Sequence, residues 1–286
     1  MKRLSKVFIN VIAVIMCAVA CFGISGCKKD MKTVELKIAV YDYENKQTYA
    51  ESEVTMTIEL YRHLAPNTVD KIIEYINDGY YNDAVFYRMS AQSSQIMLGD
   101  LKFDGDSVYQ NEIMPMIDGE FEYGGTTGSN LVNEKGSIGL WRTWTAYDAN
   151  EYYKTNTATD TGRATWYMPT NDIVSYNKWF CVFGKFNLDS ASTSKAFSAI
   201  ETAFGESGYY EEYVIYYTGE YDETKPNENF GLTFNCVPKA DFNEDMEGLF
   251  VAEGAQHVCY NHYTVQIPLT GENGTIAAKV VSAKVK

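Results

Sequence analysis

The sequence predicts a mainly β protein, a closed antiparallel barrel whose ends are covered by two helices. Several short segments alternate apolar and polar residues, which is typical of half-buried strands. Only two segments space their apolar residues as a helix does. The apolar fraction of 45% is enough to bury a core, which excludes a mainly disordered chain. Many strands with two separated helices indicate a closed antiparallel barrel.

The predicted elements begin with two alternating runs, 34–43 and 54–61, which we expect to form a hairpin across a polar turn. A helix is predicted from Pro66 to the residues before Gly79, because Pro favours the first turn of a helix and Gly the position just past its end. Residues 101–135 are rich in turns. Further strands are predicted at 85–88, 136–142, 164–168, 179–186 and 275–285, and a second helix at 194–204.

Residues 207–262 stand apart, because they are dense in Tyr and acidic residues and show no clear periodicity. We interpret them as an insertion before the last strand of one domain that spans 34–286. Two roles stay open for this insertion. It folds against the barrel and shields its edge, or it offers a binding face, since Tyr gives a large contact area at low entropic cost.

The chain is strongly acidic. It contains 38 Asp and Glu residues against 24 Lys and Arg residues, which gives a formal net charge of −14 over 286 residues. A nucleic-acid backbone is bound by clustered basic residues, and an acidic surface repels it. We therefore expect no nucleic-acid partner.

Residues 1–26 predict a bacterial lipoprotein signal peptide. Three basic residues precede an apolar run at 7–22, which is too short and too asymmetrically flanked for a membrane span. The sequence ISGC at 24–27 resembles the bacterial lipobox, in which the Cys becomes the lipidated N-terminus. This resemblance implies a lipid on Cys27, a linker at 27–33, and an extracytoplasmic protein anchored to the bacterial cell membrane. An ordinary signal peptide and a retained anchor helix are the alternatives.

The six cysteines do not predict a disulfide framework. Two lie in the predicted signal peptide, Cys27 is the predicted lipidation residue, and Cys181 lies in a predicted core strand. Only Cys236 and Cys259 remain, and the sequence leaves open whether they pair. The two His residues that flank Cys259 have no fourth partner at zinc-site spacing, so we expect no metal site.

Three groups of segments occur in the order of one known family. The first has TIELY at 57–61, APNTV at 65–69, GYY at 79–81 and VFYR at 85–88. The later groups are DGEF at 118–121 with GSIGLWR at 136–142, and ATWYM at 164–168 with VFGK at 182–185. Together they resemble the cyclophilin family of peptidyl-prolyl cis-trans isomerases, over roughly residues 34–206 plus the last strand.

The resemblance implies a cyclophilin-like barrel that accelerates rotation about X–Pro bonds. That rotation has a barrier of about 18–20 kcal/mol, because amide resonance is broken on the way. No bond is made or cut, so no nucleophile, metal or cofactor is required. The implied partners are proline-containing polypeptides, and we expect a monomer.

The resemblance also implies site residues. The catalytic arginine of the family corresponds to Arg88, and the aromatic ring of its proline pocket corresponds to Tyr167. The alternative for Arg88 is a structural arginine paired with a carboxylate, and for the aromatic residues it is a place in the barrel core. The other implied substrate-binding residues are Phe86, Gln95, Met97, Trp141, Thr165, Tyr176 and Phe180.

Three departures from the family pattern weaken the implied catalysis. The glutamine that orients the family's arginine is Met97 here, the glutamine of its aromatic motif is Thr165, and a small alanine is Trp141. A misplaced catalytic group loses about 10²-fold in rate. The resemblance therefore implies an isomerase that is slow or altered in specificity. The alternative is a catalytically inactive cyclophilin fold on a surface lipoprotein that binds peptides or a partner.

Overall fold

The computed structural model describes residues 30–49, 54–122, 131–142, 162–205, 208–219, 232–243, 262–272 and 274–286. The predicted signal peptide, Cys27 and Cys259 lie outside these ranges. Signal cleavage, lipidation and the pairing of Cys236 with Cys259 therefore stay predictions. Within the described ranges, no helix combines the length and the apolar composition needed to span a membrane.

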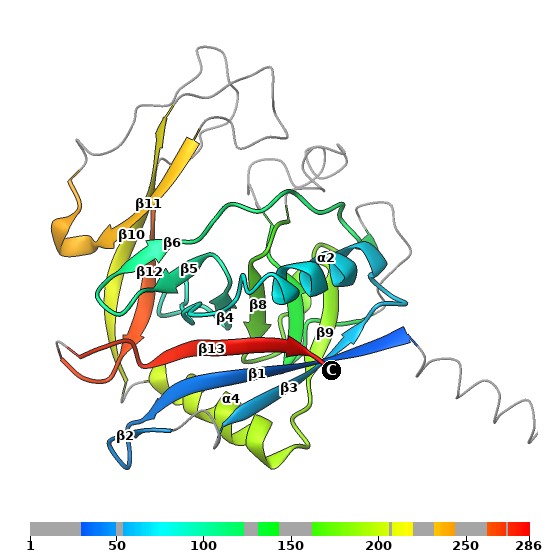
Figure 1. The fold of residues 1–286 in the computed structure, drawn as a ribbon, viewed down its shortest axis with the longest axis horizontal. Helices are drawn as coiled ribbons and strands as arrows, with labels where there is room; N and C mark the ends of the chain where they lie inside the picture. Colours follow the sequence, from blue (N-terminus) through cyan, green and yellow to red (C-terminus); the bar gives the residue numbers. More distant parts are fainter. Residues whose placement is uncertain are drawn as a thin grey trace, which may run out of the picture.

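The predicted mainly β architecture with two helices is confirmed (Figure 1). Its main part is a curled antiparallel sheet of eight strands, in the order β13, β1, β3, β9, β7, β8 and β4, with β2 paired to β1. The elements are β1 (Met31–Asp42), β2 (Gln47–Thr48), β3 (Thr55–Tyr61), α2 (Pro66–Asn77), β4 (Gln95–Leu98), β5 (Leu101–Phe103), β6 (Val108–Gln110), β7 (Ser137–Leu140), β8 (Trp166–Pro169), the 3₁₀ turn η4 (Val174–Tyr176), β9 (Val182–Phe186), α4 (Ala191–Ala203), β10 (Tyr209–Gly219), β11 (Leu232–Pro238), the 3₁₀ turn η5 (Lys239–Asp241), β12 (His262–Leu269) and β13 (Ala278–Val285).

The first two long strands form the hairpin that the alternating pattern predicts. β1 pairs antiparallel with β3, from Met31 opposite Tyr61 onward. From Val34 on, alternate side chains of both strands are fully buried, because successive side chains of a strand point to opposite faces. β1 begins at Met31, inside the segment 27–33 predicted as a linker, because pairing with Tyr61 extends the ladder.

The end strands of this sheet, β13 and β4, are joined through the backbone of residues 83–88. Toward β13, Phe86 N donates a hydrogen bond to Ala278 O at 3.2 Å. Toward β4, Tyr87 and Met97 exchange two backbone hydrogen bonds of 3.1 and 2.7 Å. The strand predicted within this segment is present only as isolated bridges. The curled sheet is therefore established, and a fully closed barrel stays a prediction.

Helix α2 is capped by a carboxylate from a distant loop. Its own N-cap residue provides no side-chain cap, and Pro66 opens the first turn. The carboxylate of Glu120 accepts hydrogen bonds from Asn67 N at 2.9 Å and Thr68 N at 2.8 Å. A negative charge there also interacts favourably with the positive end of the helix dipole. The helix ends just before Gly79, whose φ of +75° favours glycine, as the sequence predicts.

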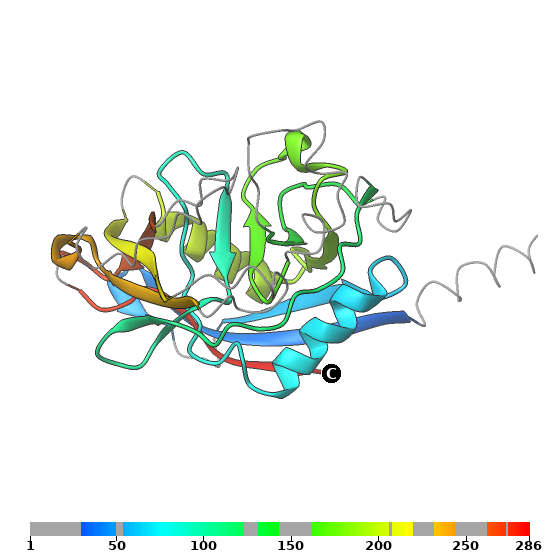
Figure 2. The same cartoon turned by 90° about the horizontal axis from the view of Figure 1, so that it is seen from above.

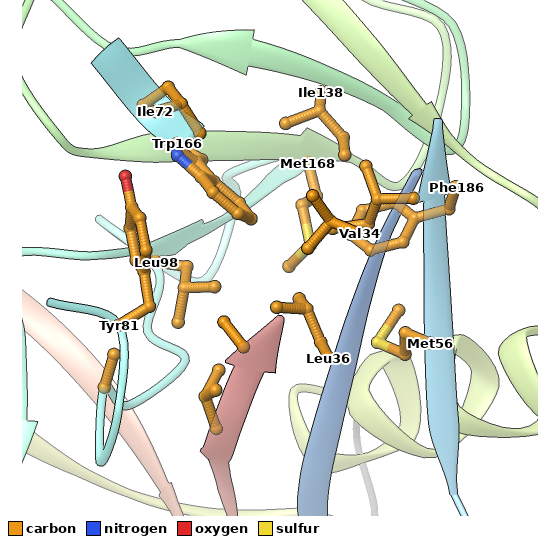
Figure 3. Packing of buried hydrophobic residues seen from close by; sticks show 14 of the residues in the cluster. Val34, Leu36, Met56, Ile72, Tyr81, Leu98, Ile138, Trp166, Met168 and Phe186 are labelled. Atoms are coloured by element: carbon orange, nitrogen blue, oxygen red, sulfur yellow. The ribbon is translucent and has the colours of Figure 1, made fainter. Parts of the chain in front are cut away.

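Both helices bury one face in the core inside the curled sheet. Figure 3 shows Leu36, Trp166 and Phe186 pointing into this core from three different strands. Helix α4 begins before the predicted range 194–204, because the side chain of Ser190 accepts the backbone N–H of Thr193 and caps an earlier first turn. The buried residues of the helices are Thr68, Val69, Ile72, Tyr75 and Ile76 in α2, and Thr193, Ala196, Phe197, Ile200 and Ala203 in α4.

A second sheet places β10 between β11 and β12, and it lies at one end of the main sheet (Figures 1 and 2). The described part of 207–262 thus forms strands, where the sequence showed no clear periodicity. Three consecutive residues of β10, Tyr213, Val214 and Ile215, are buried, so this strand has no simple alternation for the sequence to show. A separate small hairpin of β5 and β6 forms in the turn-rich range 101–135. The status of 207–262 as an insertion stays a prediction.

We expect Glu120→Ala to lower the free energy of unfolding by about 1–3 kcal/mol, because two N–H groups at the start of α2 lose their acceptor. Urea denaturation measures this loss. Glu122→Ala is the matched control, since Glu122 is exposed and pairs with Lys178 at the surface, where an ion pair contributes less than about 1 kcal/mol. Equal losses for the two variants would contradict the capping role of Glu120.

Candidate functional site

Four aromatic side chains gather beside β7 and β8, and we call them the aromatic cluster: Trp141, Tyr167, Tyr176 and Phe180. Phe180 stacks on Tyr176 and Trp141, with ring centroids 4.5 and 5.6 Å apart. Tyr167 meets the other three rings edge-on, at centroid distances of 5.5 to 6.2 Å. Tyr167 and Phe180 are buried, whereas Trp141 and Tyr176 are partly exposed and form the solvent edge. The structure thus brings together four of the residues implied by the resemblance.

Tyr167, the ring implied for the proline pocket, is held in place from two sides. A Cβ atom at Gly139 would lie 2.0 Å from Cζ of Tyr167, so only glycine leaves room for this ring. The Tyr167 hydroxyl donates to Asn133 Oδ1, and Asn133 Nδ2 in turn donates to Asn177 Oδ1 at 3.1 Å. Because Asn177 directly follows η4, these bonds tie Tyr167 to the turn that carries Tyr176.

Gln95, Met97 and Thr165 adjoin the aromatic cluster, as the resemblance implies. Met97 is fully buried and lies opposite Tyr167 in the β4–β8 ladder. Gln95 lies two residues earlier on the same face of β4, and its Nε2 donates to Tyr176 Oη at 3.1 Å. Thr165 is buried two residues before Tyr167.

Arg88, the implied catalytic residue, has its described contacts elsewhere. Its Nε donates to Gln266 Oε1 at 2.7 Å, and its Nη1 donates to the backbone oxygen of Phe204. The guanidinium also lies over the rings of Phe204 and Tyr210, at 5.4 and 5.2 Å from their centroids. Only 8% of Arg88 is exposed. The arginine is thus fixed between the end of α4 and the second sheet by carbonyl oxygens, and its catalytic role stays a prediction.

The residue beside Met97 on the neighbouring chain segment is Tyr87. The two residues form an isolated bridge, and Tyr87 is buried in the same hydrophobic cluster as Tyr167. Phe86, which the resemblance implies as a substrate-binding residue, is fully buried in the main core. Since successive side chains in an extended segment point to opposite sides, Arg88 turns away from the side of Met97.

The second sheet covers part of the surface beside the aromatic cluster. Its inward side chains belong to one buried hydrophobic cluster with Tyr87, Met97, Tyr167 and Phe180. This packing fits the interpretation that the acidic, Tyr-rich segment shields the main sheet. The inward side chains are Tyr213 and Ile215 of β10 and Val265 and Ile267 of β12.

The aromatic cluster holds neutral hydroxyl groups next to one buried guanidinium. Burial raises the pKa of Tyr167 well above its usual range, and it also raises the pKa of Tyr176 against the opposing effect of the Gln95 hydrogen bond. Both hydroxyls are therefore protonated at neutral pH. The guanidinium of Arg142 lies 5.2 Å from the ring centroid of Phe180. Within the described ranges, no three His, Cys, Asp or Glu side chains are grouped to hold a metal ion.

Sequence reasoning missed Asn133, Gly139 and Gln266. A glycine within a predicted strand indicates a close approach of another group, so Gly139 carried a usable signal. Asn133 lies in a loop, and Gln266 lies 178 residues from Arg88, so neither position shows a local pattern that points to its partner.

Comparison with known proteins matches residues 47–206 to the family model described as cyclophilin type peptidyl-prolyl cis-trans isomerase/CLD. One similar solved structure is a cyclophilin type peptidyl-prolyl cis-trans isomerase of Cryptosporidium parvum, with TM-score 0.38, 12% identity, and coverage of 73% of this chain and 97% of that chain. Another is that isomerase in the presence of the dipeptide Ala-Pro, with TM-score 0.37, 12% identity, and coverage of 72% and 98%. None of the curated proteins compared with this chain matches it.

The carboxyl group of Asp100 is buried next to Tyr87. Its Oδ1 has no hydrogen-bond partner among the described residues, while Tyr87 hydrogen-bonds the carboxyl group. Burial raises the pKa of Asp100 from 3.8 to about 6. Because the folded-state pKa exceeds the unfolded one, folding favours the protonated carboxyl. The stabilisation is complete below about pH 4 and is lost as the pH rises through 6.

We therefore expect the free energy of unfolding to fall by up to about 3 kcal/mol between pH 4 and 8, and expect Asp100→Asn to remove this fall. Urea denaturation at several pH values measures the slope. Asp104→Asn is the control, because backbone N–H groups lower the pKa of the exposed Asp104 carboxyl, which gives a slope of opposite sign. An Asp100→Asn variant with the pH slope of the original chain would refute the assignment.

Proposed function

This chain belongs to the family of cyclophilin-type peptidyl-prolyl cis-trans isomerases, and we propose that it catalyses cis–trans exchange of X–Pro bonds at a low rate. The aromatic cluster is the observation that carries this proposal. It gathers Trp141, Tyr167, Tyr176 and Phe180 next to Met97, with two partly exposed rings at its edge. A proline side chain is an apolar ring, so packing against aromatic faces suits it.

Isomerisation of an X–Pro bond requires the protein only to bind and orient the peptide, because no covalent bond is made or broken. The planar amide is stabilised by resonance, and the twisted state is not, so any contact that is stronger in the twisted state accelerates exchange. The cluster holds the proline ring while the preceding carbonyl rotates. Two features keep the rate low: the rings already contact one another, and the implied catalytic Arg88 is bonded to Gln266 and Phe204.

We further propose that the protein acts on extracytoplasmic polypeptides while anchored by a lipid on Cys27. The ISGC sequence at 24–27 and the apolar run before it support this proposal. Proline isomerisation takes about 10–100 s without a catalyst and limits the folding of proteins wherever they fold. An anchored isomerase would act on chains that emerge near the membrane.

A second candidate function is peptide or partner binding without catalysis. The placement of Arg88 favours it, because the arginine is buried and its described hydrogen bonds go to Gln266 and Phe204. Trp141 favours it as well, since a large partly exposed ring offers contact area for a ligand.

Exchange NMR on a proline-containing peptide with the full chain separates the two functions. We expect cis–trans exchange to become faster with catalytic amounts of protein, and Trp141→Ala to weaken peptide binding. Shifted peptide peaks without faster exchange would support the binding function and refute catalysis. If the peaks do not shift and exchange is not faster, both functions are refuted. An unchanged rate for Arg88→Lys would remove Arg88 from catalysis and leave isomerisation intact.

Labelling cells that express the full chain with a clickable fatty acid tests the anchor. We expect the label on the protein, and we expect Cys27→Ala to abolish it, because the lipid would be attached to that residue. Cys236→Ala is the control for loss of another partly exposed thiol and should keep the label. A label that survives Cys27→Ala, or its absence from the original chain, would contradict lipidation at Cys27.

A further inference from the structure

A carboxyl group lies where the second sheet packs on the main sheet. Asp100 stands between β4 and β5, and β6, the partner of β5, lies beside β11 of the second sheet (Figure 1). Leu101, the next residue, is buried in one hydrophobic cluster with the inward side chains of β10 and β12. The negative charge of Asp100 also acts on the thiol of Cys236 on β11. Asp100 therefore belongs to the contact between the two sheets.

The side chains of the second sheet that meet this contact form one row across its three strands. Ile215 of β10 is paired with Cys236 of β11 on one side and with Tyr263 of β12 on the other. Residues paired in this way point to the same face of a sheet. Ile215 belongs to the hydrophobic cluster that contains Tyr87, and the other two side chains pack against it. The row thus brings all three strands to the surroundings of Tyr87 and Asp100.

Asp100 is surrounded by weak acids that keep their protons. Burial raises the pKa of Tyr80, Tyr81 and Tyr87 above the usual range, and it raises the pKa of the Cys236 thiol to about 12. Among the described residues, no Lys or Arg pairs with Asp100. The titratable groups that face Asp100 are Tyr80 and Tyr81 from the turn after α2, Tyr87 from residues 83–88, Cys236 from β11 and, next to Tyr87, Tyr263 from β12.

Hydrogen bonding in this contact favours the protonated carboxyl group. Asp100 keeps some exposure as a residue, but its Oδ1 is buried and has no hydrogen-bond partner in the described part of the chain. The same holds for Oε1 of Gln110, the residue opposite Leu101 in the β5–β6 hairpin. Buried acceptors without a donor are unfavourable, and a protonated Asp100 replaces one acceptor by an O–H donor.

We propose that Asp100 is a pH-dependent latch between the two sheets. When its carboxyl group is protonated, the second sheet packs closely on the main sheet. When the group is ionised, lifting of the second sheet gives the charge access to water, and desolvation of an unpaired charge is unfavourable. The covered hydrophobic cluster includes Tyr167 and Phe180 of the aromatic cluster. The latch thus links pH to access to the surface beside the aromatic cluster, and it does not depend on catalysis.

The pH range of the latch follows from the ionisation of Asp100. Burial raises its pKa from 3.8 to about 6, so the packed state prefers the protonated group. This preference is complete below about pH 4 and is lost as the pH rises through 6. If the carboxyl group regains its ordinary pKa when the sheet lifts, the lifted population, relative to that of Asp100→Asn, rises about tenfold between pH 5 and 8 and levels off near pH 7.

The reactivity of the Cys236 thiol in the full chain measures lifting. A thiol reacts as its thiolate, and the raised pKa suppresses the thiolate while the sheet is packed. Cys181 is the matched control, because burial raises its pKa to about 12 as well but it lies in the main core. Both rates are measured with 4,4′-dithiodipyridine from pH 5 to 8 and assigned by peptide mass spectrometry. Each rate is divided by the rate in Asp100→Asn at the same pH.

We expect the Cys236 ratio to rise about tenfold from pH 5 to 8 and the Cys181 ratio to stay constant. An equal rise of both ratios would mean global unfolding and would overturn the latch. A flat or falling Cys236 ratio would overturn it too, because an ionised Asp100 below a packed sheet disfavours the neighbouring thiolate.

Two further measurements keep the test decisive. Asp104→Asn changes an exposed carboxyl group in the turn of the β5–β6 hairpin, and it should keep the pH profile of the original chain. Near-ultraviolet circular dichroism checks that Asp100→Asn keeps its aromatic packing. If that variant does not fold, the rate of Cys236 divided by that of Cys181 in the original chain should itself rise about tenfold between pH 5 and 8, and a constant quotient would refute the latch.

Discussion

The structure depends on residues 83–88, a short segment whose backbone is hydrogen-bonded on both edges. One edge bonds to β13 and the other to β4, so the segment connects the two ends of the curled sheet. An extended segment bonded on both edges has a fixed register, and register decides which side chains face the core. Here Phe86 is buried in the main core, and Tyr87 is buried in the hydrophobic cluster that contains Met97 and Tyr167. If the pairing of this segment shifted by one residue, Phe86 and Tyr87 would exchange sides, and Arg88 would move to the side of Met97.

This register separates the two parts that the family mechanism needs. The aromatic rings are carried by β8, η4 and the segments next to β7 and β9, and they pack on one another. The guanidinium of Arg88 is bonded to β12 and to the end of α4. Electrostatic stabilisation requires the charged or polar group to reach the reacting atoms, so the proposed catalysis by Arg88 would require this guanidinium to reach a substrate from where these bonds hold it. Met97, which the resemblance places where the family has a glutamine, lies with Tyr87 and Tyr167 in one buried hydrophobic cluster, a setting that suits an apolar side chain.

Local signals predicted the local elements. Alternation predicted the β1–β3 hairpin, and Pro66 and Gly79 predicted both ends of α2, because these signals act within a few residues. The aromatic cluster was predicted only through the family resemblance, since its members come from separate parts of the chain. The contacts of Gln266 with Arg88 and of Glu120 with α2 could not be predicted, because they join residues 178 and about 50 positions apart without a local pattern. The strand β10 was missed because its buried residues, Tyr213, Val214 and Ile215, follow one another and lie among Tyr and Glu residues.

The position of β13 has a consequence for how the chain acquires its fold. β1 lies between β3 and β13, and just past β13 the backbone N–H of Lys286 donates to Thr33 O. During synthesis from the N-terminus, one edge of β1 therefore stays unpaired until Ala278–Val285 has been made. Such a long-range pairing slows folding and keeps the edge open to wrong partners in the meantime.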